Sequence, residues 1–166
     1  MSFKNDLKKG NKGENEVIKV FKKHGIELVK NTDAKHLKDF DLIGKIGTKK
    51  ITIEVKYDYM SEKTGNIALE FYNSSKDEAS GIDCTKSKVW AHIIMDMGFP
   101  TIWVTSTKTL KAYIKKNKPF RIVENAGDGN ANLYLYNIDT ILSAIFHRID
   151  KVTKDAFSKI IKEVLK

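Results

Sequence analysis

The sequence predicts one α/β domain in which a mixed central sheet is flanked by helices. The chain has 166 residues, of which 41% are hydrophobic, enough to bury a single core. Apolar residues at helical spacing alternate along it with short apolar runs that end at glycines and polar loops. No low-complexity linker or internal repeat divides the chain. We therefore expect one domain over 1–166, with a core over about 11–106 and a basic C-terminal extension over about 107–166.

The first half of the chain is expected to form one helix and then several strands. Val17, Val20 and Phe21 recur at helical spacing and Gly25 ends their run, which predicts a helix over 11–24. The expected elements that follow are strands at 26–29, 40–46, 51–57 and 66–72, with polar loops at 31–38 and 73–83.

The second half is expected to be richer in helices. The largely apolar segment 85–97 is interpreted as a helix, and the apolar run 101–105 after Pro100 as a buried strand. The remaining expected elements are a basic helix at 108–117, strands at 120–123 and 133–136 around a turn at 127–130, and helices at 138–147 and 153–165.

Positive charge is in excess and is unevenly placed. The chain has 30 Lys and Arg against 21 Asp and Glu, a formal net charge of +9. Residues 1–38 contain ten lysines and five acidic residues, and the segment between Asp96 and Glu124 contains six basic residues and no acidic one. This excess indicates a polyanionic partner, with nucleic acid first, although a merely soluble lysine-rich surface would give the same total.

Cysteine content and hydropathy exclude several classes of protein. Cys84 is the single cysteine, so neither an internal disulfide nor a cysteine-rich zinc site can form. No run of about 18 apolar residues occurs, and the first residues lack the apolar segment of a secretion signal. We therefore expect no membrane segment and a cytoplasmic location, or action in the host cytoplasm if the protein is virus-encoded.

The most informative segment is KDFDLIGKIGTKKITIEVK, residues 38–56. Gly47-Thr48 fits a two-residue hairpin turn of type II′, which sets the register of the two strands. The expected pairs are Phe40–Val55, Leu42–Ile53 and Gly44–Ile51 on one face, and Asp41–Glu54 and Asp39–Lys56 on the other. Two carboxylates would then lie side by side, with Lys56 next along the same strand face.

This pair of carboxylates can be explained in two ways. Like charges across a ladder are destabilising, and a divalent cation between Asp41 and Glu54 would offset the repulsion. Oxygen ligands with open positions suit Mg²⁺ rather than zinc, and Lys56 could contact an attacking water or a phosphate oxygen. A solvated face, with its charge partly neutralised by Lys45, Lys50 and Lys56, fits the same pattern, so the register alone leaves both interpretations open.

These residues resemble the PD-(D/E)XK nuclease superfamily, whose motif combines a helix glutamate, an aspartate in one strand and Glu-X-Lys in the next. The likeness to archaeal-type Holliday junction resolvases runs through KGENEVIKVFKKHGI (12–26), FDLIG (40–44) and IEVK (53–56). Phe40 stands where the family's name has proline. The resemblance covers about 12–57, the order of elements through about 106 is also similar, and both imply a restriction-endonuclease-like fold.

The resemblance implies a role for each matching residue. Asp41 and Glu54 would bind the metal directly, with the backbone carbonyl of Val55 as a further ligand. Lys56 would orient or deprotonate the attacking water. The implied metal is Mg²⁺, for which Mn²⁺ would substitute.

Glu14 would correspond to the helix glutamate that completes the metal shell. Glu16 is its rival, because the spacing from Lys12-Gly13 to Glu14 is shorter than the family pattern leads us to expect.

The activity implied is metal-dependent endonucleolytic hydrolysis of DNA. The first expectation is a structure-directed enzyme of recombination or repair that acts as a homodimer on branched or duplex DNA. A restriction-type or phage DNA-degrading nuclease is the alternative within this class. A non-catalytic DNA-binding module on the same fold is the alternative outside it.

Five lysines are expected to contact the DNA backbone, and the role of one further acidic residue, Glu70, has two possible interpretations. The lysines are Lys12, Lys86, Lys88, Lys111 and Lys115. Lys86 lies with Ser80, Gly81 and Thr85 at the N-terminus of the helix expected at 85–97, where free N–H groups suit phosphate, although ordinary capping by Thr85 is the alternative. Glu70 could approach the metal site or sit on a polar strand face, and we favour the polar face.

Overall fold

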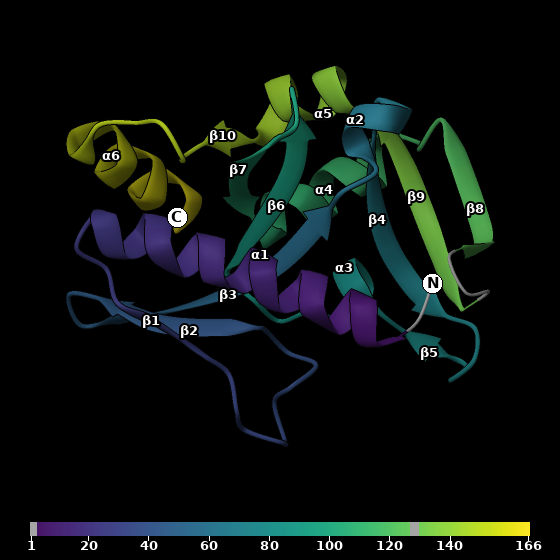
Figure 1. The fold of residues 1–166 in the computed structure, drawn as a ribbon, viewed down its shortest axis with the longest axis horizontal. Helices are drawn as coiled ribbons and strands as arrows, with labels where there is room; N and C mark the ends of the chain where they lie inside the picture. The colour runs from purple at the N-terminus through teal and green to yellow at the C-terminus, as the bar shows by residue number, and fades with distance from the viewer. Residues whose placement is uncertain (1–2, 127–129) are drawn as a thin grey trace.

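The computed structural model describes residues 3–126 and 130–166 (Figure 1). The helices are α1 (Phe3–Lys23), α2 (Ser61–Thr64), α3 (Gly81–Cys84), α4 (Thr107–Lys116), α5 (Ile138–Ile145) and α6 (Lys154–Val164). The strands are β1 (Leu28–Lys30), β2 (Leu42–Ile46), β3 (Lys49–Asp58), β4 (Asn66–Asn73), β5 (Glu78–Ala79), β6 (Val89–Asp96), β7 (Phe99–Ser106), β8 (Arg121–Ala126), β9 (Ala131–Asn137) and β10 (His147–Arg148).

The centre of the molecule is a six-stranded sheet in the order β1-β2-β3-β6-β7-β10. Its β3 and β6 run parallel and every other neighbouring pair runs antiparallel, so the sheet is mixed and the predicted fold class is confirmed. A parallel pair needs a long crossover, which is provided here by α2, β4, β5 and α3. Within that crossover, β4 and β5 join β9 and β8 in a second sheet, in the order β5-β4-β9-β8.

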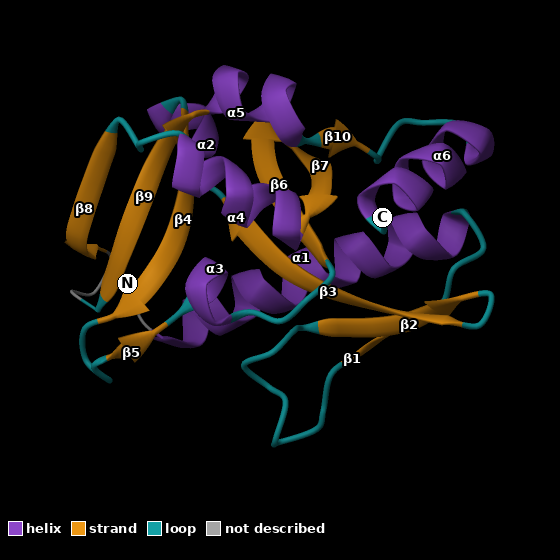
Figure 2. Ribbon diagram, turned by 180° about the vertical axis from the view of Figure 1, so that it is seen from behind, coloured by secondary structure: helices purple, strands orange, loops and turns teal. Residues whose placement is uncertain are grey.

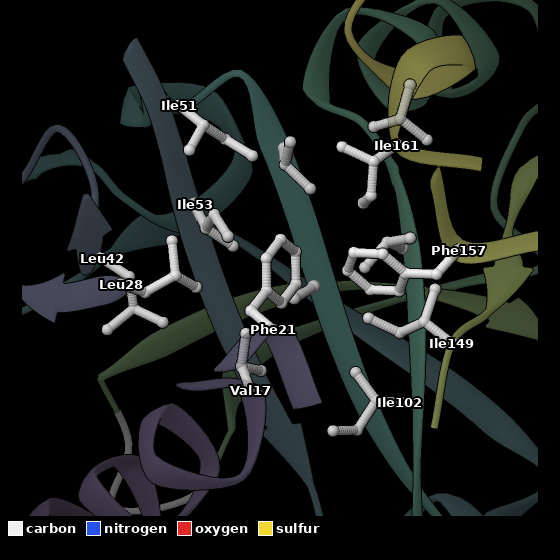
Figure 3. Packing of buried hydrophobic residues seen from close by; sticks show 14 of the residues in the cluster. Val17, Phe21, Leu28, Leu42, Ile51, Ile53, Ile102, Ile149, Phe157 and Ile161 are labelled. Carbon is white, nitrogen blue, oxygen red and sulfur yellow. The ribbon is translucent and has the colours of Figure 1, made fainter. Parts of the chain in front are cut away.

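One face of the central sheet is covered by α1 and α6 (Figures 1 and 3). Val17 and Phe21 of α1 and Phe157 and Ile161 of α6 pack with Ile53 of β3 in a single buried cluster. The rings of Phe21 and Phe157 meet edge to face, 5.1 Å between centroids at 85°, a favoured geometry for an aromatic pair. The apolar side of the amphipathic helix predicted from the sequence is thus buried against this face of the sheet.

The opposite face is covered by the second sheet together with α4 and α5 (Figure 2). Trp90 of β6 packs there in a cluster with Leu69 of β4 and Leu110 of α4. Successive strand residues point to opposite faces, and Ile53 points to the α1 face. Glu54 and Lys56 therefore both point to the opposite face, toward the second sheet.

The hairpin register of the sequence prediction is confirmed within the strands. Leu42 pairs with Ile53 and Gly44 with Ile51, and residues 47–48 form the turn. Gly47 has φ +59° and Thr48 does not have positive φ, which matches a type II′ turn.

The predicted pairing of residues 39–41 is wrong, because β2 begins at Leu42 rather than at residue 40. The N–H of Asp41 donates to the carbonyl of Ile53 (3.0 Å), and the N–H of Val55 donates to the carboxylate of Asp41 (2.8 Å) instead of to a backbone carbonyl. The ladder pairs expected for Phe40, Asp41 and Asp39 are therefore not formed.

The helix predicted over 85–97 is also wrong, because Val89–Asp96 is the strand β6. This strand lies between β3 and β7 and is buried on both faces over 89–94, where every residue except His92 is apolar, so it lacks the alternation that marks a half-buried strand. The first helix begins at Phe3, earlier than expected. Of the turn predicted at 127–130, residues 127–129 lie outside the described part. No helix in the described residues is long and apolar enough to cross a membrane.

Candidate active site

Two carboxylates meet where β2 begins beside the middle of β3. Asp41 directly precedes β2 and is held by the N–H of Val55, 2.8 Å from its Oδ2. Glu54 precedes that same Val55 in β3, and its Oε2 lies 3.0 Å from the hydroxyl of Thr85. The Thr85 hydroxyl also lies 2.9 Å from the carbonyl of Asp39, so it can donate to either oxygen. Asp41 is thus placed by a main-chain donor rather than by the ladder.

The two carboxylates titrate as an interacting pair. Burial, and after it the negative charge of Asp41, together raise the pKa of Glu54 to about 8. Burial also raises the pKa of Asp41 to about 6, with a contribution from the charge of Glu14. Lys56 and the hydrogen bonds from Thr85 and Val55 oppose these increases. At neutral pH the pair therefore does not carry two full negative charges unless a cation is present.

Lys56 lies on the same strand face as Glu54 and points toward the second sheet. Its Nζ lies 3.4 Å from Oε2 of Glu70, a residue of β4. The hydroxyl of Ser80 donates to the other oxygen of Glu70 at 2.6 Å. The strand pattern favoured a plain polar face for Glu70, but the charge of Glu70 is close enough to raise the pKa of Glu54. Glu70 was underrated because its strand belongs to a different sheet.

A glycine allows Ser80 and Glu70 to approach each other. Gly81 has φ +49°, and a Cβ on it would lie 2.3 Å from the carbonyl oxygen of Glu70. Any other residue would therefore clash with the backbone of β4.

A close approach of α1 to the sheet brings Glu14 to the carboxylate pair. A Cβ on Gly13 would lie 3.1 Å from Cβ of Tyr57 and 3.2 Å from Cδ1 of Ile93, so the helix rests almost directly on β3 and β6. The next residue, Glu14, affects the pKa of Asp41 and forms an ion pair with Lys30, 2.9 Å between Oε2 and Nζ.

Glu16 is directed elsewhere. It forms an ion pair with Lys19, one turn further along α1, at 2.9 Å. Of the two glutamates that the sequence left as rivals, Glu14 is the one that the fold brings to Asp41.

The five lysines expected to contact DNA are not all gathered together. Lys86, Lys111 and Lys115 line one groove beside α4. Lys12 instead lies over the ring of Tyr57, with its Nζ 5.8 Å from the centroid, and Lys88 donates to the carbonyl of Lys50 at 2.8 Å. The phosphate site expected at a helix N-terminus near residues 85–86 is wrong, since a strand follows there.

The donor set at this site fits Mg²⁺. Asp41, Glu54 and the carbonyl of Val55 offer hard oxygen ligands, and Mg²⁺ is commonly held by one or two carboxylates with several waters. In the described part of the chain no three His, Cys, Asp or Glu side chains gather as a ready-made metal site. Glu14 is held by Lys30 instead. A cation bound by Asp41, Glu54 and the Val55 carbonyl would therefore have open coordination positions for water and phosphate.

Comparison with known proteins identifies a fold rather than a family. No protein-family model matches the sequence, and no curated protein matches it. Among solved structures, the chain is similar to the bacterial homing endonuclease I-Ssp6803I, with a TM-score of 0.50 and 17% sequence identity. The match covers 68% of this chain and 74% of that chain. The mixed α/β fold is therefore shared with an endonuclease.

Proposed function

We propose that this protein is a Mg²⁺-dependent DNA endonuclease. The observation that carries the proposal is the buried pair of Asp41 and Glu54. Burial raises the pKa of both carboxyls, and the charge of Asp41 adds to the increase for Glu54, so a divalent cation bound between them would offset the cost of ionising the pair. The likeness of the fold to a homing endonuclease and the net charge of +9 support DNA as the substrate.

Asp41, Glu54 and the carbonyl of Val55 would hold the metal, and Glu14 would complete its outer shell. The ion would polarise the phosphate and neutralise the charge that develops on it during hydrolysis. The reaction joins a water oxygen to phosphorus and breaks the bond from phosphorus to one bridging oxygen of the backbone.

Lys56 would orient the attacking water or a phosphate oxygen through its ammonium group. Glu70 holds this ammonium at 3.4 Å and is itself held by Ser80, so the lysine is restrained on the side of the second sheet. Such restraint favours catalysis because it fixes the donor before the substrate arrives.

Within the nuclease class we propose a structure-directed enzyme that resembles the junction resolvases. The support for this finer assignment is the likeness of 12–57, and symmetric cutting of a four-way junction would require a homodimer. A restriction-type or phage nuclease is the alternative subtype. A DNA-binding module without catalysis is disfavoured, because it would gain nothing from burying Asp41 against Glu54.

The proposal is tested by cleavage of labelled linear duplex, single strand and a synthetic four-way junction, each with Mg²⁺, with Mn²⁺ and with EDTA. We expect cutting with either metal and none with EDTA, and Lys56→Ala should bind DNA with little change while cutting at least about 100-fold more slowly. Lys162→Ala, which removes an exposed lysine of α6, is the matched control and should cut as the wild type does.

The outcomes separate the alternatives. No metal-dependent cutting of any substrate would leave the binding module as the better description. Equal cutting by the wild type and Lys56→Ala would overturn the assigned site. Symmetric nicking restricted to the junction would support the resolvase subtype, and cutting restricted to linear duplex would contradict it.

A further inference from the structure

A basic groove lies next to the carboxylate pair. It has a volume of about 560 Å³ and is formed by the segment 85–87 and by one side of α4. Four of the residues that line it are lysines, and no acidic residue of the described chain lines it. The lysines are Lys86, Lys108, Lys111 and Lys115. The groove is therefore a concentrated patch of positive charge on a concave surface.

The spacing of three of these lysines gives the patch a direction. Lys108, Lys111 and Lys115 are three and four residues apart on α4, so they follow one face of the helix. Seven residues of helix rise about 10 Å, and the phosphates of one DNA strand succeed one another every 3.4 Å or so along the duplex axis. A row about 10 Å long therefore spans about three phosphate-to-phosphate steps of one strand along the duplex axis.

Thr85 connects the groove directly to the candidate active site. Its carbonyl accepts a hydrogen bond from Nζ of Lys111 at 3.0 Å, while its hydroxyl lies 3.0 Å from Glu54 Oε2. Figure 2 shows α3 and α4 on the same side of the molecule, and the two helices are in contact. The middle lysine of the row, Lys111, is therefore linked through one residue, Thr85, to a carboxylate proposed to hold the metal.

The lysine side chains in the groove differ in their exposure and in whether they already contact another residue of the protein. Lys86 is 76% exposed and forms an ion pair with Asp39, 3.0 Å between Nζ and Oδ1. Lys108 and Lys115 are exposed, whereas Lys111 is half-buried against Thr85. Of the α4 lysines that line the groove, Lys108 and Lys115 are thus the two presented to a partner in solution.

We propose that this groove binds the phosphodiester backbone of the DNA strand on one side of the bond to be cut. The inference rests on the proposed function and specifies how its substrate is held. Lysine contacts to phosphate position a duplex and carry no sequence information, so binding through the groove is independent of base sequence. Because Thr85 contacts both Lys111 and Glu54, a strand bound in the groove would pass next to the carboxylate pair.

The experiment measures DNA binding by a variant that does not cut. In a Glu54→Gln background, the dissociation constant for a labelled duplex is determined over a series of salt concentrations for Lys108→Ala/Lys115→Ala. The matched control is Lys159→Ala/Lys162→Ala, which removes the same charge from exposed positions of α6 on the other face of the sheet. Melting temperatures of all variants verify that they are folded.

Loss of two phosphate contacts should lower the slope of log affinity against log salt by about 1.8 and weaken binding roughly 50-fold at 0.1 M salt. The control pair should change the slope by less than about half a unit. Equal slopes and affinities for the two double variants would overturn the proposal.

The groove and the nuclease assignment can fail separately. If the wild type cuts DNA with Mg²⁺ and the groove variant, with Glu54 restored, binds and cuts as the control does, the groove is wrong and the nuclease stands. If the wild type never cuts but the groove variant loses affinity as expected, the groove stands as a DNA-binding surface and the nuclease assignment is wrong.

Discussion

The free energy of unfolding should fall as the pH is raised from about 5 to about 8, because Glu54 keeps its proton longer in the folded protein than in the unfolded chain. The unfolded glutamate loses its proton near its ordinary pKa of 4.5, whereas burial and Asp41 raise the folded value to about 8. The unfolded state therefore binds fewer protons between these pH values. Stability from this group is fully present below pH 4.5 and is lost as the pH rises through 8.

The size of the effect follows from the difference between the two pKa values. Each unit of difference corresponds to about 1.4 kcal/mol, so the loss between about pH 5 and about pH 8 is on the order of 4 kcal/mol. A domain of this length changes its melting temperature by roughly 2–4 °C per kcal/mol, which gives roughly 8–16 °C. Glu54→Gln removes the charge and retains an acceptor for Thr85, so it should melt higher than the wild type at the upper pH.

The assay is a melting curve at each pH, in buffer without divalent cations, for the wild type, Glu54→Gln and the control Glu124→Gln. Glu124 is an exposed residue of β8, so its variant should follow the wild type. A wild-type melting temperature that does not fall between the two pH values, or a Glu54→Gln protein that falls as steeply as the wild type, would refute the reasoning.

Three further predictions concern the metal, the helix contact and the second core. Millimolar Mg²⁺ at about pH 8 should raise the melting temperature of the wild type but not of Glu54→Gln, and an equal rise in both would place the metal elsewhere. In urea, Gly13→Ala should be less stable than Gly10→Ala by roughly 1–3 kcal/mol, because its Cβ would crowd Tyr57 of β3 and Ile93 of β6 whereas a Cβ at residue 10 has nothing within 4 Å; equal effects would contradict the close contact. Trp90→Phe should cost roughly 1–3 kcal/mol in the same assay, because the buried Nδ1 of His92 loses its donor at 3.1 Å, and a change below about 0.5 kcal/mol would contradict that bond.

Local chemistry made part of the site predictable. The alternation in 51–56 and the glycine of the turn fixed which residues of the hairpin share a face, because strand side chains repeat with a period of two. The predicted strand pairing holds as far as Leu42 and fails at Asp41. There the side chain of Asp41, instead of a backbone carbonyl, accepts the hydrogen bond from the N–H of Val55. Competition between a side chain and the ladder cannot be seen in a pattern of hydrophobicity.

Continuous apolar runs were the main source of error in the fold. Residues 89–95 are apolar except for His92, and such a run fits both a buried strand and a buried helix, so periodicity could not separate the two states. Burial between β3 and β7 decided for a strand, because each of its faces is covered by a different hydrophobic cluster.

By itself, the sequence determined the mixed α/β class and the hairpin register from Leu42 to the turn, and it indicated Asp41, Glu54 and Lys56 as the candidate site. The register was predictable because it depends on residues that face each other across one tight turn. Tertiary structure decided that Glu14 rather than Glu16 reaches Asp41, through the contact made by Gly13. It also brought Glu70 to Lys56 from a second sheet and set four lysines in one groove beside Thr85. Such meetings are fixed by the packing of elements distant in the chain, and packing is a property of the whole core rather than of any local segment.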